Sequence, residues 1–223
     1  MSESTVAQPS ADQALIHAAI LLFGRDGYAA VSTRALSEAA GTNISAIKYY
    51  FGGKEELYRA AVAHVGEVLT PRMEFAMAAF EQGRSLVGDD RERQAQLISQ
   101  LVSRIIHVFL TDEHIPSFLP FVLREFFTPS PHFDIFYDAF PRHLHELWTE
   151  IVALAYDLDP EDEVTIVRAH GIIGQMMIFH VGRQVLFRRL NWDDFTPERI
   201  ELITSEVQQL VLRALSFPPE SQT

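Results

Sequence analysis

The stretch that most constrains this chain runs from Val31 to Lys54, VSTRALSEAAGTNISAIKYYFGGK, and reads as two short helices joined by a tight turn. The first helix is predicted to begin at Ser32 or Thr33, whose hydroxyl can accept from the orphan N–H groups of the first turn, and to end at Ala40. Gly41 supplies the positive φ that closes a helix. A second helix is then predicted over 44–50.

The outward face of the second helix suits the major groove of DNA. Ile47 and Phe51 are expected to face inwards, whereas the outward residues are small, hydroxyl-bearing or cationic: Ser45, Ala46, Lys48, Tyr49 and Tyr50. Small side chains allow close approach, hydroxyls can reach phosphates or base edges, and a lysine neutralises phosphate charge.

Lysine placement strengthens this interpretation, because the chain has only two lysines, Lys48 and Lys54, and both fall inside the stretch. Lys54 is expected at the start of the next helix, where its ammonium and the helix dipole could hold a phosphate together. An ordinary surface helical hairpin is the alternative. We expect DNA contacts from nine residues: Thr33, Arg34, Asn43, Ser45, Ala46, Lys48, Tyr49, Tyr50 and Lys54.

The segment GYAAVSTRALSEAAGTNISAIKYYFGGKEELY, followed by a long helical remainder, resembles the TetR family of transcriptional repressors. The resemblance spans Ser10 to about Thr70. It departs at Gly53, where many members carry a serine or asparagine that caps the following helix. The resemblance implies a ligand-responsive repressor that binds a palindromic operator as a dimer and is released by a small-molecule inducer.

Charge is unevenly distributed over the 223 residues, which carry a formal net charge of −12 and no cysteine. Between Ser10 and Thr70 there are five basic and six acidic residues, so the acidic excess lies in the remainder. We expect modest, strongly salt-dependent binding to random DNA. The first ten residues, MSESTVAQPS, do not resemble a signal peptide, and polar residues interrupt the apolar stretch 171–187. These features favour a cytoplasmic protein without a membrane partner.

Hydrophobic periodicity and capping residues predict an all-α fold in two domains. The expected division is a disordered arm over 1–9, a helix-turn-helix DNA-binding domain over 10–70, a regulatory, ligand-binding and dimerisation domain over 71–216, and a tail over 217–223. Helices beyond the hairpin are expected over 11–25, 54–69, 71–81, 91–110, 115–127, 131–155, 160–189 and 197–216. Thr70-Pro71 marks the predicted domain boundary.

The last two long helices are apolar over more than one face, which a single domain core cannot cover. Gly171 and Gly174 would allow another helix to approach closely. We expect a homodimer that forms through a four-helix contact of these helices, because two-fold homodimers are the commonest oligomers. A thick monomeric core is the alternative.

The segment LPFVLREFFTPSPHFDIFYDAF, residues 119–140, resembles the regulatory domain of a TetR branch typified by CecR-like regulators. That resemblance implies a small-molecule inducer and control of membrane transport or efflux genes. Aromatic side chains to bury an organic ligand, with a few polar groups to orient it, are the expected lining of the ligand site. The candidates are Phe109, Phe121, Arg124, Phe127, Tyr137, Gln175 and His180, although ordinary core packing explains an aromatic residue equally well.

An enzyme is the rival interpretation, since nine histidines invite a metal-hydrolase hypothesis. Residues two apart on a helix, such as His143 and His145, point about 200° apart and do not converge. No HExxH pair, phosphate loop or nucleophile elbow is present. We therefore expect no catalysis, no cofactor and no metal site. A helical protein-interaction module that does not bind DNA remains the alternative function, but it leaves the placement of both lysines unexplained.

Overall fold

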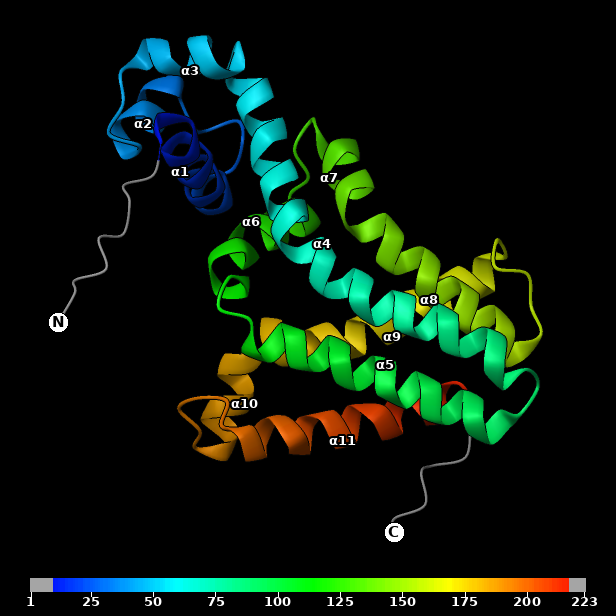
Figure 1. Ribbon diagram of the computed structural model, residues 1–223. Helices are drawn as coiled ribbons and strands as arrows, with labels where there is room; N and C mark the ends of the chain where they lie inside the picture. The colour runs from blue at the N-terminus through cyan, green and yellow to red at the C-terminus, as the bar shows by residue number, and fades with distance from the viewer. Residues whose placement is uncertain (1–9, 217–223) are drawn as a thin grey trace, which may run out of the picture. The chain divides into compact units, whose positions relative to one another are not determined.

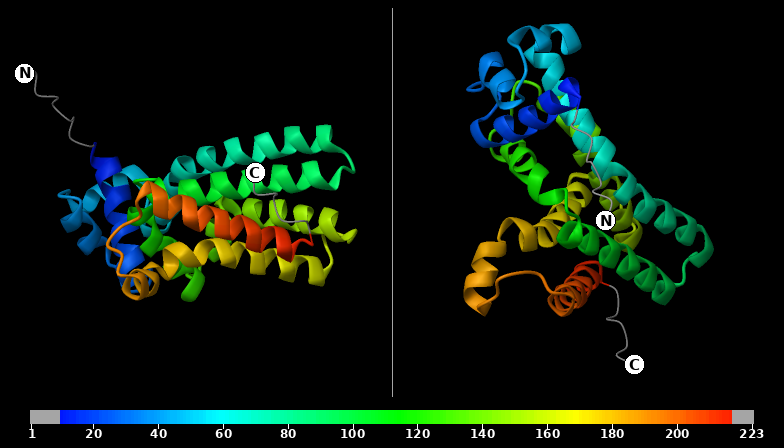
Figure 2. Two further views of the ribbon diagram at one scale, coloured as in Figure 1. Left: turned by 90° about the horizontal axis from the view of Figure 1, so that it is seen from below. Right: turned by 60° about the vertical axis from the view of Figure 1, so that its left-hand side comes forward.

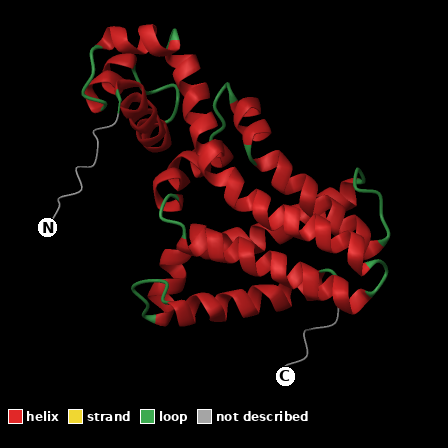
Figure 3. Ribbon diagram, viewed as in Figure 1, coloured by secondary structure: helices red, strands yellow, loops and turns green. Residues whose placement is uncertain are grey.

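The computed structural model describes residues 10–216, apart from the side chains of Arg72, Met73 and Ala76. Every regular element in this range is a helix, which confirms the all-α prediction (Figures 1 and 3). The helices are α1 (Ala11–Asp26), α2 (Thr33–Ala39), α3 (Ile44–Phe51), α4 (Lys54–Val87), α5 (Arg91–Thr111), α6 (Ile115–Phe127), α7 (Phe133–Ala139), α8 (Pro141–Tyr156), α9 (Glu163–Val181), α10 (Arg183–Leu190) and α11 (Pro197–Ala214). The predicted arm and tail lie outside the described residues.

The helices form two compact units, and the first is assembled from two separate stretches of chain. Of the described residues, unit 1 contains 10–69 together with Glu113–Phe140, and unit 2 contains Thr70–Asp112 together with 141–216. The first break along the chain lies between Leu69 and Thr70. The segment that carries α6 and α7, which the sequence analysis assigned to the regulatory domain, belongs to unit 1 instead.

Helix α6 joins unit 1 because it packs against α1 at very short range. A Cβ added at Gly24 of α1 would lie only 2.7 Å from the backbone nitrogen of Phe121 in α6. From the next turn of α6, Arg124 Nε donates to the Gly24 carbonyl at 3.4 Å, and its Nη2 donates to the Arg25 carbonyl. The guanidinium thus satisfies carbonyls that the end of α1 leaves without intrahelical partners.

An aromatic cluster completes the core of unit 1. The fully buried Tyr58 of α4 lies with its ring 5.7 Å from that of Phe23 and 5.3 Å from that of Tyr28. The ring of His132, which precedes α7, lies 4.7 Å from that of Tyr28, and Ser130 Oγ donates to the Tyr58 hydroxyl at 3.2 Å. Burial raises the pKa of Tyr58, so its hydroxyl stays protonated.

Unit 2 is a bundle in which α8 packs on α9 and α11 packs on both α5 and α9 (Figures 1 and 2). Trp148 of α8 is fully buried at its centre, and Gln208 Nε2 of α11 donates to the Ser99 carbonyl of α5 at 2.9 Å. Thr196 caps α11 by accepting from the Arg199 amide, as the Thr-Pro sequence predicts.

Three predicted helix boundaries are wrong. Helix α4 continues through Pro71 to Val87, because buried residues on both sides, Leu69 and Phe80, anchor it despite the lost hydrogen bond. The predicted helix over 131–155 is divided between α7 and α8 before Pro141, and the one over 160–189 is divided between α9 and α10 at Gly182. Proline at a helix start and glycine at a helix end account for these two divisions.

The close approach of α6 to α1 predicts that Gly24→Ala destabilises unit 1 by about 1–3 kcal/mol, because the backbone of α6 must move to admit a methyl group. Gly53→Ser is the matched control. No atom lies within 4 Å of a Cβ at Gly53, and serine is a better helix cap, so this change should stabilise by about 0.5 kcal/mol. Denaturant unfolding measures the free energy of unfolding of both variants. A Gly24→Ala variant with an unchanged free energy of unfolding would contradict the close packing of α6 on α1.

Candidate DNA-binding surface and ligand cavity

Helices α2 and α3 are held at their turn by side-chain caps. Ser32 Oγ accepts from the Ala35 amide at 3.1 Å and begins α2. Gly41 adopts a φ of +64° after α2, as predicted. Asn43 then caps α3 by accepting from the Ser45 amide at 3.1 Å, which fixes the start of the second helix.

Helix α3 presents one buried and one exposed face. Ile47 is 2% exposed and anchors the inner face, while Phe51 is half-buried. On the outer face, Ser45 and Lys48 are exposed, and Tyr49 and Tyr50 are 81% and 49% exposed. The structure therefore presents hydroxyl, ammonium and phenol groups on one helix surface, with the half-buried Ala46 as the small residue among them.

Two candidate contacts lie at the start of α2. Thr33 is half-buried and Arg34 is exposed, with Arg34 Nε 2.8 Å from Glu38 Oε1 one turn along the helix. An exposed ion pair of this kind contributes only about 0.3–0.5 kcal/mol. Arg34 can therefore exchange Glu38 for a phosphate at little cost.

Lys54 lies at the start of α4, as predicted, but its charge is directed at the protein. Its Nζ lies 4.4 Å from the centre of the Tyr28 ring, a cation–π contact, and burial lowers the pKa of the ammonium. Glu55 and Glu56 occupy the first turn of the same helix. Among the nine candidate residues, Lys54 is the one whose charged group makes a cation–π contact with an aromatic ring of the described residues.

The seven candidate ligand residues are divided between the two units. Phe121, Arg124, Phe127 and Tyr137 belong to unit 1, and the others to unit 2. Phe121 is 1% exposed in the core and Arg124 caps α1, whereas Phe127 is 75% and Tyr137 40% exposed. The structure therefore accounts for Phe121 and Arg124 by the packing of α6 on α1.

The remaining candidates, Phe109, Gln175 and His180, lie in unit 2. His180 is buried, and its Nε2 lies 3.1 Å from Arg183 Nη1. Burial, followed by the nearby Arg183, lowers the pKa of the imidazole, while the main chain of Phe109 acts in the opposite direction. Gln175 Oε1 is buried without a hydrogen-bond partner among the described residues. His180 Nδ1 is likewise buried without a partner among the described residues, so these two atoms are the polar groups of the predicted set that are left to bind a ligand or water.

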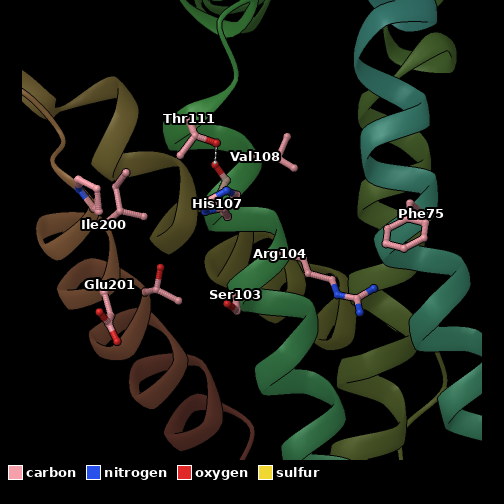
Figure 4. Close-up of a pocket in the computed structure, with 10 residues that line it drawn as sticks. Phe75, Ser103, Arg104, His107, Val108, Thr111, Ile200 and Glu201 are labelled. Carbon is pink, nitrogen blue, oxygen red and sulfur yellow. Dashed lines mark hydrogen bonds between the residues drawn. The ribbon is translucent and has the colours of Figure 1, made fainter.

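A cavity of about 610 Å³ in unit 2 lies between α4, α5 and α11 (Figure 4). Its lining is Phe75, Ser103, Arg104, His107, Val108, Thr111, Pro197, Ile200, Glu201 and Thr204. Arg104 extends from α5 towards Phe75, and the guanidinium lies 5.2 Å from the centre of that ring. A cavity of this size, with apolar walls and a few charged groups, suits a small organic ligand.

None of the residues that line this cavity is among the seven predicted ligand residues. One signal was available: Ser103, His107 and Thr111 recur every four residues along α5 and therefore share a face beside an apolar stripe. The facing residues come from α4 and α11, which lie far away in sequence. Their proximity is a property of the bundle.

The histidines of unit 2 form pairs rather than a metal centre. His143 Nδ1 lies 3.7 Å from Glu146 Oε2, and His145 Nε2 lies 3.1 Å from His170 Nδ1. No group of three or more histidine, aspartate or glutamate side chains in residues 10–216 is placed to hold a metal ion.

Two family models match the chain. Residues 15–61 match the model described as bacterial regulatory proteins, tetR family. Residues 94–216 match the model described as the C-terminal domain of the HTH-type transcriptional dual regulator CecR. A curated relative, the HTH-type transcriptional dual regulator CecR of Shigella flexneri, is 31% identical over 219 residues, which cover 95% of this chain and 96% of the relative.

Solved structures show the same fold. The fatty acid degradation regulator FadR from Bacillus halodurans superposes with a TM-score of 0.55 at 17% identity, covering 92% of this chain and 96% of that one. AibR, solved in complex with isovaleryl coenzyme A and operator DNA, gives a TM-score of 0.54 at 17% identity, covering 95% of this chain and 100% of that one.

The exposed face of α3 predicts that Lys48→Ala combined with Tyr49→Ala weakens binding to a specific duplex by at least about tenfold, because groove and phosphate contacts are lost together. Since both side chains are exposed, stability should change by less than about 0.5 kcal/mol. Fluorescence anisotropy at several salt concentrations measures the affinity. The slope of the logarithm of the affinity against the logarithm of the salt concentration should become shallower by about the amount that one phosphate contact contributes.

The matched control is Arg59→Ala combined with Tyr137→Ala, which removes one cation and one exposed tyrosine elsewhere in unit 1. If this control weakened DNA binding as much as the α3 double variant, α3 would not be the DNA-reading helix.

Proposed function

Because the chain belongs to the TetR family of bacterial transcriptional regulators, in its CecR-like branch, we propose that it is a repressor that binds a palindromic operator as a homodimer. The observation that carries the proposal is the exposed face of α3, capped by Asn43, with Ser45, Lys48 and Tyr49 directed away from the core. A small-molecule inducer releases the protein from DNA. The regulated genes are those of membrane transport or efflux, and the protein works in the cytoplasm without a cofactor or catalytic activity.

In the proposed complex, α3 enters the major groove and α2 lies across its rim. Ala46 permits close approach of the helix, and Ser45 and Tyr49 supply hydroxyls for base edges or phosphates. Lys48 and Arg34 neutralise phosphate charge. At the edges of this surface, the sugar-phosphate backbone of the DNA is contacted by Thr33, Asn43 and Tyr50. Lys54 contributes through the N-terminal end of α4, with Tyr28 holding its side chain in place.

A homodimer is supported by the outer face of α9, which is apolar although the fold leaves it uncovered. Along this face, six residues recur alternately every three and four positions, and we call them the α9 stripe: Val164, Val167, Gly171, Gly174, Ile178 and Val181. Val167 is 70% and Ile178 56% exposed, and α11 adds Leu202 at 52%. This is the spacing with which one helix packs along another. Two reading helices held in this way require an operator with two half-sites.

Helix α9 is also long and apolar enough, by length and composition alone, to cross a membrane. Its inner face, however, contributes Ala169, Ile172 and Met176 to the core of unit 2. A second copy, which would cover only the outer face, leaves this core intact. The dimer therefore accounts for both faces of the helix.

The inducer is proposed to occupy the cavity between α4, α5 and α11, whose wall includes His107 and Thr111 on the last turns of α5. Three residues after α5, the chain enters α6, which packs on α1. A ligand that favours another position of the end of α5 thereby acts on unit 1 through α6. The coupling follows from differential binding to two arrangements and needs no contact between ligand and DNA. The complex of the structural neighbour AibR with both an acyl coenzyme A and operator DNA is consistent with such a scheme.

Selection of bound sequences from a random duplex pool tests the operator. The wild type should enrich one palindromic sequence, with half-sites about one helical turn or a multiple apart. The same sequence placed ahead of a reporter gene should lower expression in cells that make the protein. A rise in expression would assign activation instead of repression, and failure to enrich any sequence would favour a protein-interaction module.

Filling the cavity tests the ligand site. Ile200→Trp should abolish binding of a fluorescent anilinonaphthalene sulfonate probe, because Ile200 lies in the cavity wall and the larger indole occupies the space that the probe needs. Leu86→Trp is the control, since Leu86 is an apolar residue 80% exposed outside the cavity. Equal probe binding by wild type and Ile200→Trp would contradict the assignment.

A further inference from the structure

The two ends of the α9 stripe carry opposite charges. Five carboxylates lie within the seven residues Asp157–Glu163, which include the start of α9. At the other end, α10 carries Arg183, Arg188 and Arg189 in a chain whose net charge is −12. We name these two groups the acidic segment and the α10 arginines.

Neither group finds a charged partner among the described residues of its own chain. In the described part of one chain, Arg188 and Arg189 form no ion pair, and the carboxylates of the acidic segment form none either. The 19 residues of α9 separate the groups by about 28 Å, so they cannot reach each other within one copy. The carboxylates of the acidic segment, Arg188 and Arg189 are exposed and available to another molecule, whereas Arg183 is half-buried beside His180.

The exposed pattern along α9 is symmetric about its two glycines. Counting outwards from the midpoint between Gly171 and Gly174, Val167 lies as far away as Ile178, and Val164 as far as Val181. In the same count, Asp162 corresponds to Arg183 and Asp157 to Arg188. A two-fold interface requires this kind of self-complementarity, because residue i meets residue j and residue j meets residue i.

The glycines also indicate where two copies would cross. No atom lies within 4 Å of a Cβ built at Gly171 or Gly174, so these positions form the lowest point of the exposed face. Another helix can approach most closely there. Antiparallel crossing at this point brings the acidic segment of each copy beside the α10 arginines of the other, whereas parallel crossing would place like charges together.

Helix α10 provides a surface suited to this contact. None of its residues is buried in the single chain. Gln184, Val185, Arg188 and Arg189 line a hollow of about 610 Å³ on its outer side, and Val185 is 77% exposed. The hollow combines an apolar floor with two unpaired guanidinium groups, which suits an acidic stretch of chain.

We propose that the acidic segment of one copy and the α10 arginines of a second copy form an electrostatic latch at each end of an antiparallel α9 pair, and that this latch sets the register and partner choice of the dimer. The inference rests on the homodimer proposed above and adds its orientation and the residues that specify it. The apolar stripe supplies contact area, and the charges exclude the parallel arrangement and unrelated partners.

Charge reversal on either side provides the test. The basic-side variant is Arg188→Glu with Arg189→Glu, and the acidic-side variant is Glu161→Arg with Glu163→Arg. Neither variant changes Asp162, which precedes α9, or the Arg183 contact with His180. Sedimentation should show each variant alone dimerising at least about tenfold more weakly than wild type, because the substituted side chains meet like charges in both latches. An equimolar mixture should recover the dimer, because one latch of the mixed pair keeps its wild-type charges and the other pairs the introduced arginines with the introduced glutamates.

The control is Glu113→Arg with Asp134→Arg, which makes the same charge change in unit 1 and should leave dimerisation unchanged. Recovery on mixing also shows that both variants are folded. If the wild type is a dimer and the charge-reversed variants also remain dimers, the latch is overturned and the homodimer stands. The same holds if the variants are monomers that do not form dimers on mixing. A wild type that is monomeric, or that floats with vesicles of anionic lipid, would overturn the proposed homodimer as well.

Discussion

The packing of α6 on α1 is the contact on which the organisation of this chain depends. Gly24 allows the two backbones to meet, and Arg124 then uses its guanidinium to complete the hydrogen bonding at the end of α1. Because of this contact, the unit that carries the helix-turn-helix is not a simple N-terminal domain. It also contains residues 113–140, which follow α5 in the sequence, whereas the intervening residues 70–112 belong to the other unit.

This arrangement gives the proposed ligand response a physical route. The cavity in unit 2 is lined by the last turns of α5, and the three residues Asp112–His114 connect α5 to α6. Since interiors are close-packed, α6 cannot shift against α1 without moving Phe121 or Arg124. In the proposed scheme, a ligand in the cavity would bias the position of α3 through α6, in addition to any movement of α4.

Local signals in the sequence predicted the helix-turn-helix geometry well. The caps of α2 and α3, the turn glycine and the buried Ile47 are set by residues within one or two turns of each other, so short-range rules suffice. Position in the sequence was a poor guide beyond this point. Phe121 and Arg124 looked like ligand residues, but their partners in α1 lie about a hundred residues away, and the cavity wall combines three distant helices. Such contacts depend on how helices pack, which periodicity alone does not contain.

Hydrogen exchange of the full chain, measured with and without its selected operator duplex, tests the central claim most directly. The account predicts that operator binding protects the amides of the turn and of α3, with weaker protection at the start of α2, and leaves the exposed face of α9 unchanged by DNA itself. Protection confined to α9, α10 or α11, with no change over residues 43–51, would contradict the assignment of α3 as the helix that reads DNA.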